Sequence, residues 1–313
     1  MDDFHVQIRH EIDALAEYLK LITCEEQQVF DGQFHARLKH INELSLKCPE
    51  ERYELTKYCA KSCAYELDRC SISHYGRNKP LGYQGDYLVN DWIYKKNIPS
   101  HPLNKLWEEF YHRFPITQAI RNRKEYFNNL FCELTGKSPE GIAVLNLGCG
   151  SCKEVAEAIV RAGRAAAASS FHCIDKESNA IAYAQNTIQE AKTGHVTFQW
   201  ELSTVLRLQT ERRYGLVWAG GLLDFMGDFY TTKLLKAAWD WTAPGGMAVL
   251  SNLHPDNPSR NAMEWCWKWF LLYRTKDNMQ RLCDMARIPQ SSVRFEQEPL
   301  GICTFCIMTK PAC

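Results

Sequence analysis

The sequence predicts an α/β fold: a Rossmann-like, mostly parallel sheet of seven strands, preceded by a helical N-terminal region. Two observations carry this prediction. After residue 136, short apolar runs alternate with segments whose apolar residues recur at helical spacing, which indicates strands separated by helices. Before that point, apolar residues recur every three or four positions. We therefore expect a helical region over residues 1–135 and a sheet domain over 136–313.

The expected N-terminal helices cover residues 5–22, 35–46, 51–67 and 104–134, where Pro115 marks a break or a new first turn. Between them, SISHYGRNKPLGYQGDYLVNDWIY (71–94) is dense in glycine and tyrosine. Glycine and proline interrupt helical patterns. This segment is expected to be loop-like, with residues 73–94 forming a lid.

The sheet domain shows a regular alternation. Expected strands lie at residues 141–148, 169–175, 195–202, 214–221, 245–253, 292–299 and 304–310, with helices at 153–163, 178–191 and 230–242. Because the chain closes on two strands in succession, we expect an antiparallel last strand at the sheet edge.

Composition narrows the class of protein. The chain has 313 residues, and Lys+Arg and Asp+Glu balance at 37 each, which gives no electrostatic reason to expect nucleic acid as a partner. It lacks an apolar run of about 18 residues and a signal-peptide layout, so neither a membrane span nor export is expected. We expect a cytoplasmic protein whose 14 cysteines are reduced.

The stretch NLGCGSCKE (146–154) has two interpretations. Cys149 and Cys152 have the spacing of a thiol–disulfide redox pair. Gly148 and Gly150 also form a glycine turn between a strand and a helix, where backbone can approach a ligand closely. The dinucleotide fingerprint G-x-G-x-x-G fails here, because Lys153 occupies the third glycine position.

Five motifs in order support the nucleotide interpretation. VLNLGCGSCKE, CIDKE, WEL, AGGLLDF and APGGMAVLSN resemble the motifs of class I S-adenosylmethionine-dependent methyltransferases, over about residues 140–310. The resemblance implies S-adenosylmethionine as the cofactor. Cofactor contacts are implied for Asn146, Gly148, Cys149, Gly150, Asp175, Lys176, Glu201, Leu202 and Gly220.

Individual roles follow from the same resemblance. Gly148 and Gly150 would face the methionine part, with Cys149 between them, and Asp175 would hold the ribose. Lys176, Glu201 and Leu202 would border the adenine, whereas Gly220 would lie near the methionine amino group and the substrate. Asn146 stands where the family often has a carboxylate. The alternatives are a plain tight turn for the glycines and a helix N-cap for Asp175.

A finer resemblance reaches into the first half. PLGYQGDYLVNDWIY, AIRNRKEYF, SNLHPDNPSR and MEWCWKWFLLYRT resemble a bacterial methyltransferase subfamily whose best-known member makes the methyl ester of 3-hydroxypalmitic acid, a quorum signal. It implies carboxyl O-methylation of a fatty or hydroxy acid. Two alternatives stay open: O- or N-methylation of another small molecule or natural-product intermediate, and a non-catalytic module that binds the cofactor.

Candidate acceptor-side residues come from both halves. His254 follows the fifth strand and is the candidate base; its alternative is an anchor for the HPDNP turn. Arg121 or Arg123 could bind a carboxylate. Because they are two apart on a helix, only one is expected to face the site, and Arg121 is our candidate. The lid would lie over the cofactor. We expect Tyr75 to contact the cofactor and Tyr83 to act in catalysis, whereas Asp86 has a helix cap as its alternative role.

Two further groups of residues have competing interpretations. Trp265, Trp267, Trp269, Phe270 and Tyr273 suit core packing better than an acyl pocket. Cys59 and Cys63 begin the C-x3-C-x2-C pattern of radical enzymes, but Glu66 breaks it. Without zinc-finger spacing elsewhere, no metal is expected.

Overall fold

A computed structural model describes residues 3–21, 27–96, 102–192 and 196–312. Residue 22, the last of the expected helix 5–22, and residue 195, the first of the expected strand 195–202, lie outside these ranges. The chain forms two compact units. The first comprises Met1–Gln118 with Asn257–Phe270, and the second Ala119–Asp256 with Leu271–Cys313.

This division differs from the expected boundary at residue 135 because α8 (Pro115–Lys137) packs on the sheet along most of its length. The ring of Phe131 lies 5.3 Å from that of Phe171, and Tyr126 stacks on Phe305 at 3.8 Å. A helix whose aromatic face is buried by the sheet belongs to the sheet domain.

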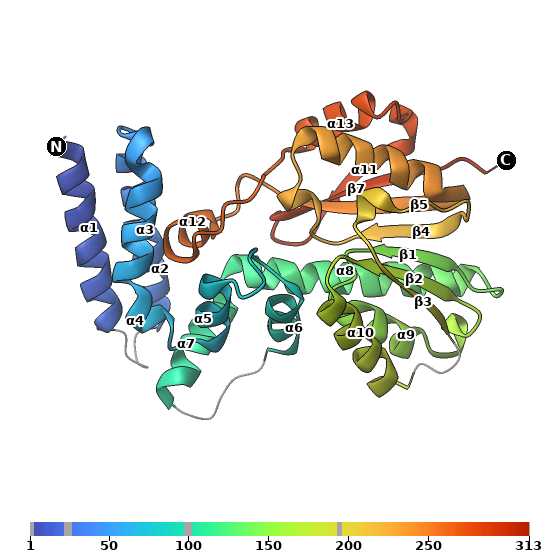
Figure 1. The fold of residues 1–313 in the computed structure, drawn as a ribbon, viewed down its shortest axis with the longest axis horizontal. Helices are drawn as coiled ribbons and strands as arrows, with labels where there is room; N and C mark the ends of the chain where they lie inside the picture. Colours follow the sequence, from blue (N-terminus) through green and yellow to red (C-terminus); the bar gives the residue numbers. More distant parts are fainter. Residues whose placement is uncertain (1–2, 22–26, 97–101, 193–195, 313) are drawn as a thin grey trace. The chain divides into compact units, whose positions relative to one another are not determined.

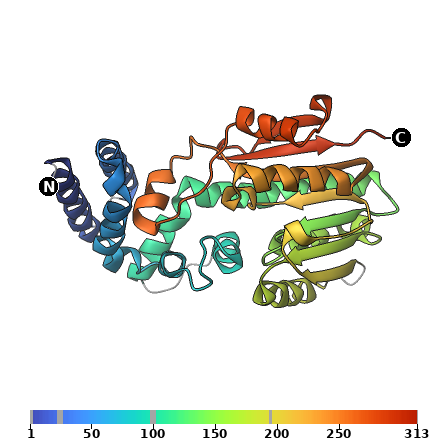
Figure 2. The same ribbon diagram turned by 45° about the horizontal axis from the view of Figure 1, so that its top comes forward.

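The first unit is helical. Its helices are α1 (Asp3–Lys20), α2 (Gln27–Ser45), α3 (Arg52–Ser62), α4 (Ala64–Leu67), α5 (Ser71–Asn78), α6 (Tyr87–Lys95), α7 (Pro102–Arg113) and α12 (Arg260–Trp267). Ile8, Ile12, Leu15 and Leu19 form one buried stripe on α1. This stripe explains why α1 packs against α2 and α3 (Figure 1, Figure 2).

The expectation of a loop over residues 71–94 was wrong for most of that segment. α5 and α6 occupy it, and only residues 79–86 connect them. Asp86 caps α6 by accepting hydrogen bonds from the N–H groups of Leu88 and Val89, at 3.0 and 3.2 Å. The alternative role of Asp86 as a helix cap is therefore the one the structure displays.

Gly76 explains why composition was misleading here. It lies inside α5, where a Cβ atom would be 2.9 Å from Cζ2 of Trp269, and its carbonyl accepts a hydrogen bond from Nε1 of Trp269 at 3.0 Å. The glycine is therefore a packing requirement within a helix. Trp267 is likewise buried and donates to Oγ of Ser73 at 2.8 Å. We interpret these tryptophans as core residues of the first unit.

The second unit is a seven-stranded sheet covered by helices. Its strands are β1 (Ala143–Leu147), β2 (Ser170–Asp175), β3 (Thr197–Leu202), β4 (Tyr214–Ala219), β5 (Thr242–Leu253), β6 (Val293–Gln297) and β7 (Cys303–Thr309). Helices α9 (Lys153–Ala162) and α10 (Ser178–Glu190) neighbour each other on one face, and α11 (Asp228–Trp241) and α13 (Lys276–Met285) on the other (Figure 1).

The strand order is β3-β2-β1-β4-β5-β7-β6. Neighbouring strands from β3 to β5 pair in parallel, whereas β7 is antiparallel to both β5 and β6. The predicted fold class is thus confirmed. Strand order reverses between β1 and β4, and open α/β sheets bind ligands at the carboxyl ends of the strands at such a point.

Candidate functional site

The loop after β1 has the backbone of a ligand cradle. Gly148 and Gly150 have positive φ angles of 65° and 53°. A Cβ atom on Gly148 would lie 2.6 Å from Cδ2 of Leu222, which follows β4. Any larger residue at 148 would therefore adopt a strained backbone angle and force the side chain of Leu222 to shift. The close approach joins the loops after β1 and β4 at the point where strand order reverses.

Asp175 ties this loop to the end of β2. Its Oδ2 accepts a hydrogen bond from the N–H of Gly150, and its Oδ1 accepts one from the N–H of Glu177, both at 3.0 Å. Burial of the carboxyl raises its pKa, and these backbone donors oppose the rise. Each carboxylate oxygen can accept a second hydrogen bond. Asp175 thus organises the loop and retains acceptor capacity for a ligand.

Asn146, on β1, has an unusual buried atom. Its side chain is 1% exposed, and its Oδ1 has no hydrogen-bond partner among the described residues. Leaving a buried polar atom unpaired costs about 1–3 kcal/mol. A ligand that donates a hydrogen bond at this position would remove that cost.

Two hydrogen bonds of His172, which the sequence did not suggest, link side chains of β2, β3 and β4. Buried His172 shares a hydrogen bond of 3.0 Å between its Nε2 and Oε2 of Glu201, while its Nδ1 lies 2.8 Å from Oη of Tyr214. Glu201 is therefore held from within the sheet. Leu202 is 61% exposed and presents an apolar surface beside it. The half-exposed side chain of Lys176 lies 3.7 Å from Glu177.

One of the two candidate arginines lies beside the β4 loop. Arg123 is 6% exposed, and a Cβ atom on Gly221 would lie 2.6 Å from its Nη1. Arg121 is only half-buried, and burial lowers its pKa. Gly220 is the residue before Gly221, whose N–H donates to Oγ of Ser251 at 3.0 Å. At a strand reversal such as that between β1 and β4, the loops after the two strands border the crevice in which ligands bind. The structure therefore favours Arg123 over Arg121 as the arginine of this crevice.

The thiols of the glycine loop are enclosed. Cys149 and Cys152 are 2% and 0% exposed, and Sγ of Cys152 lies 3.9 Å from Sγ of Cys173. Burial raises the pKa of Cys152 well above its ordinary value. A reactive cysteine needs an accessible thiolate. The geometry therefore favours small packing residues over a redox pair.

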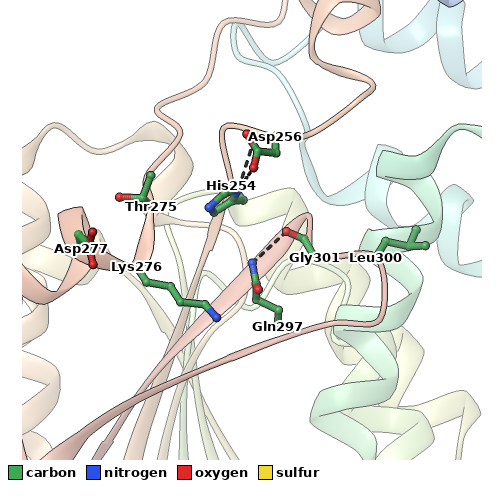
Figure 3. Close-up of a pocket in the computed structure, with 8 residues that line it drawn as sticks. All are labelled: His254, Asp256, Thr275, Lys276, Asp277, Gln297, Leu300 and Gly301. Carbon is green, nitrogen blue, oxygen red and sulfur yellow. Dashed lines mark hydrogen bonds and ion pairs between the residues drawn. The ribbon is translucent and has the colours of Figure 1, made fainter.

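His254 lies apart from the glycine loop, after β5. It lines a pocket of about 480 Å³ together with Asp256, Thr275, Lys276, Asp277, Gln297, Leu300 and Gly301 (Figure 3). Its Nδ1 accepts a hydrogen bond from the N–H of Asp256 at 3.3 Å. Through this hydrogen bond His254 anchors the HPDNP turn, which is its alternative role in the sequence-based prediction. Because it uses the Nδ1 lone pair, the neutral ring carries its proton on Nε2.

The tyrosines of the expected lid belong to the first unit. Oη of Tyr75 donates to Oδ2 of Asp86 at 2.9 Å, and burial is the main reason that the pKa of Tyr75 is raised. Tyr83 lies half-buried in the loop between α5 and α6. Roles of Tyr75 and Tyr83 toward the cofactor or acceptor stay predictions.

Comparison with solved structures identifies related folds. A possible exported protein from Bordetella parapertussis aligns with a TM-score of 0.62 and 20% identity, over 79% of this chain and 88% of that one. At this identity the match shows the fold alone.

Methyltransferases align less closely. Magnesium protoporphyrin IX methyltransferase from Synechocystis PCC 6803, with S-adenosylhomocysteine bound, has a TM-score of 0.48 and 11% identity, over 71% of this chain and 98% of its own. The Burkholderia thailandensis 1,6-didemethyltoxoflavin-N1-methyltransferase has a TM-score of 0.44 and 14% identity, over 60% and 78%. No family model and no curated protein matches the sequence.

The described residues contain no helix with the length and apolar character to cross a membrane. In the same described residues, no group of three or more His, Cys, Asp or Glu side chains could hold a metal ion.

Proposed function

We propose that the chain is a methyltransferase that uses S-adenosylmethionine, and that it methylates the carboxylate of a fatty or hydroxy acid in the cytoplasm. One observation carries the cofactor assignment. The glycine loop after β1 is tied by Asp175 to the end of β2, at the point where strand order reverses. A loop that approaches a ligand closely, next to a carboxylate that can accept from two hydroxyls, suits a nucleoside without a pyrophosphate.

The residues at the crevice fit the parts of this cofactor. Asp175 would accept from the ribose hydroxyls, and Leu202 would cover the adenine beside Glu201. The unpaired Oδ1 of Asn146 suits the methionine ammonium group. The buried guanidinium of Arg123 beside Gly221 suits the methionine carboxylate. Each of these assignments pairs a hydrogen-bond donor with an acceptor.

Methylation of a carboxylate requires few functional groups from the protein. The bound sulfonium supplies an electrophilic methyl group. A carboxylate acceptor is already a nucleophile at neutral pH, so the chain must bind it, orient its oxygen in line with the methyl group and exclude water. No general base is required, which agrees with a His254 whose Nδ1 is occupied by the Asp256 N–H. An alcohol or phenol would need such a base.

The cofactor assignment is tested by calorimetric titration with S-adenosylhomocysteine. We expect saturable binding by the wild-type protein, and no binding would refute the proposal. The acceptor is tested by a screen of acids, phenols and amines with methyl-labelled cofactor, followed by alkaline hydrolysis. Esters release the label as methanol, whereas ethers and amines retain it. Binding without turnover would favour a cofactor-binding module instead.

A further inference from the structure

The pocket of Figure 3 has its own set of polar groups, separate from the glycine loop. It opens where β5 and β6 end and where α13 begins. Nζ of Lys276, the ring of His254 and the amide of Gln297 face the same space, whereas the carboxylate of Asp277 points away (Figure 3). This convergence of three side chains from three elements is what a small polar ligand requires.

The hydrogen bonds within the pocket show what it offers. Nδ1 of His254 accepts from Asp256, so its Nε2–H remains a donor. Nε2 of Gln297 donates to the carbonyl of Gly301 at 3.1 Å and to Oγ1 of Thr304 at 3.2 Å. Lys276 is exposed and makes no hydrogen bond or ion pair within the described part of the chain. The pocket therefore presents one ammonium group and one ring donor, beside the carboxylates of Asp256 and Asp277.

Two carboxylates limit the charge that the pocket can accept. Oδ2 of Asp256 lies 3.5 Å from Nδ1 of His254, and the Asp256 side chain is 89% exposed. Asp277 follows Lys276 in the first turn of α13. Two nearby negative charges would repel a dianion more strongly than a monoanion. The combination favours a single carboxylate over a phosphate group.

The position of the pocket relates it to the crevice. The pocket and the crevice both lie at the carboxyl ends of strands in the same sheet. From β4 outward, the strands follow in the order β5, β7 and β6. Neighbouring strands are about 4.8 Å apart, so the pocket centre is on the order of 10 Å from the end of β4. Gly220, which follows β4, is the residue expected near the acceptor.

We infer that this pocket binds a second carboxylate of the methyl acceptor, one that is not itself methylated, so that the substrate is a dicarboxylic acid. The inference rests on the proposed function, because the methylated carboxylate would lie near Gly220. The distal carboxylate would pair with Lys276 and accept from Nε2–H of His254. The acyl chain would span the two positions.

Suberate and octanoate test this inference, since they share chain length and differ in the distal carboxylate. Both would be titrated calorimetrically into the S-adenosylhomocysteine complex of the full chain. We expect suberate to bind about tenfold more tightly, as one charge-assisted contact implies. Lys276→Met should remove this preference. Lys236→Met is the matched control, because Lys236 is an exposed lysine of the same unit that pairs with Asp240 on α11.

The outcomes are separable. A suberate preference that is lost in Lys276→Met and kept in Lys236→Met supports the inference. Equal binding of the two acids, binding of neither, or a preference that survives Lys276→Met would overturn it. Failure of the proposed function would appear earlier and differently, as absence of S-adenosylhomocysteine binding in the first titration.

Discussion

Replacing Gly148 with alanine tests the close approach of the loops after β1 and β4. The new Cβ atom would lie 2.6 Å from Cδ2 of Leu222, and φ at this position is 65°. A left-handed conformation costs a residue with a side chain about 1–2 kcal/mol. Forcing Leu222 to repack adds about 1–3 kcal/mol. We therefore expect Gly148→Ala to lower the free energy of unfolding by about 2–5 kcal/mol.

Gly245→Ala is the control for backbone strain alone. Gly245 has φ of 76°, and the nearest atom to its Cβ atom would be Cβ of Ala312 at 3.9 Å, an ordinary contact. It should cost only the conformational part, about 1–2 kcal/mol. Urea unfolding measures both variants. A double-mutant cycle with Leu222→Ala then isolates the steric coupling between residues 148 and 222.

The same variants report on the ligand site. Because Leu222 belongs to the β4 loop, its displacement should weaken S-adenosylhomocysteine binding by about tenfold or more, equivalent to about 1.4 kcal/mol. Gly245→Ala should bind normally. If Gly148→Ala were no more damaging than Gly245→Ala in either measurement, the close approach would not exist in solution, and the reasoning would be refuted.

Of three other predictions, two concern the same crevice and the third concerns Glu154, in the first turn of α9. Asp175→Ala should weaken S-adenosylhomocysteine binding at least about tenfold, and unchanged affinity in calorimetry would reject the ribose assignment. Arg123→Lys should weaken it similarly while Arg121→Lys does not, since only Arg123 lies beside Gly221; equal effects would contradict this. Burial raises the pKa of Glu154 from 4.5 to about 7. The folded state therefore favours the protonated carboxyl. Between these pH values, the free energy of unfolding of the wild-type protein should fall relative to that of Glu154→Gln as the pH rises. If urea unfolding showed a constant difference between the two proteins, the pKa of Glu154 would be ordinary.

Much of the second unit could be predicted from local patterns. Strands such as Ala143–Leu147 and Tyr214–Ala219 are short apolar runs, and all seven expected strands are present with the antiparallel β7. Gly148 and Gly150 were identifiable because a positive φ after a strand leaves a local mark in the sequence. Asp175 was identifiable because it ends the next strand.

Predictions failed where a residue's role depends on a distant partner. Gly76 looked like a loop residue, but it lies inside a helix beneath Trp269, which is far away in the sequence. The sequence places His172 in a strand without a special role, and only the structure shows its hydrogen bonds with Glu201 and Tyr214. The contribution of α12 to the first unit was likewise hidden, since residues 257–270 interrupt the sheet domain.

The sequence by itself determined the fold class, the glycine loop and the carboxylate that accompanies it, because each depends on residues within one or two neighbouring elements. The tertiary structure decided which arginine lies in the crevice, which atom of Asn146 is left unpaired, and which side chains surround His254. These depend on convergence of separate elements. Arg123 on α8 meets the loop after β4, and Lys276 on α13 faces His254 after β5. Periodicity in a sequence records which face of an element is buried, but packing alone decides what that face meets.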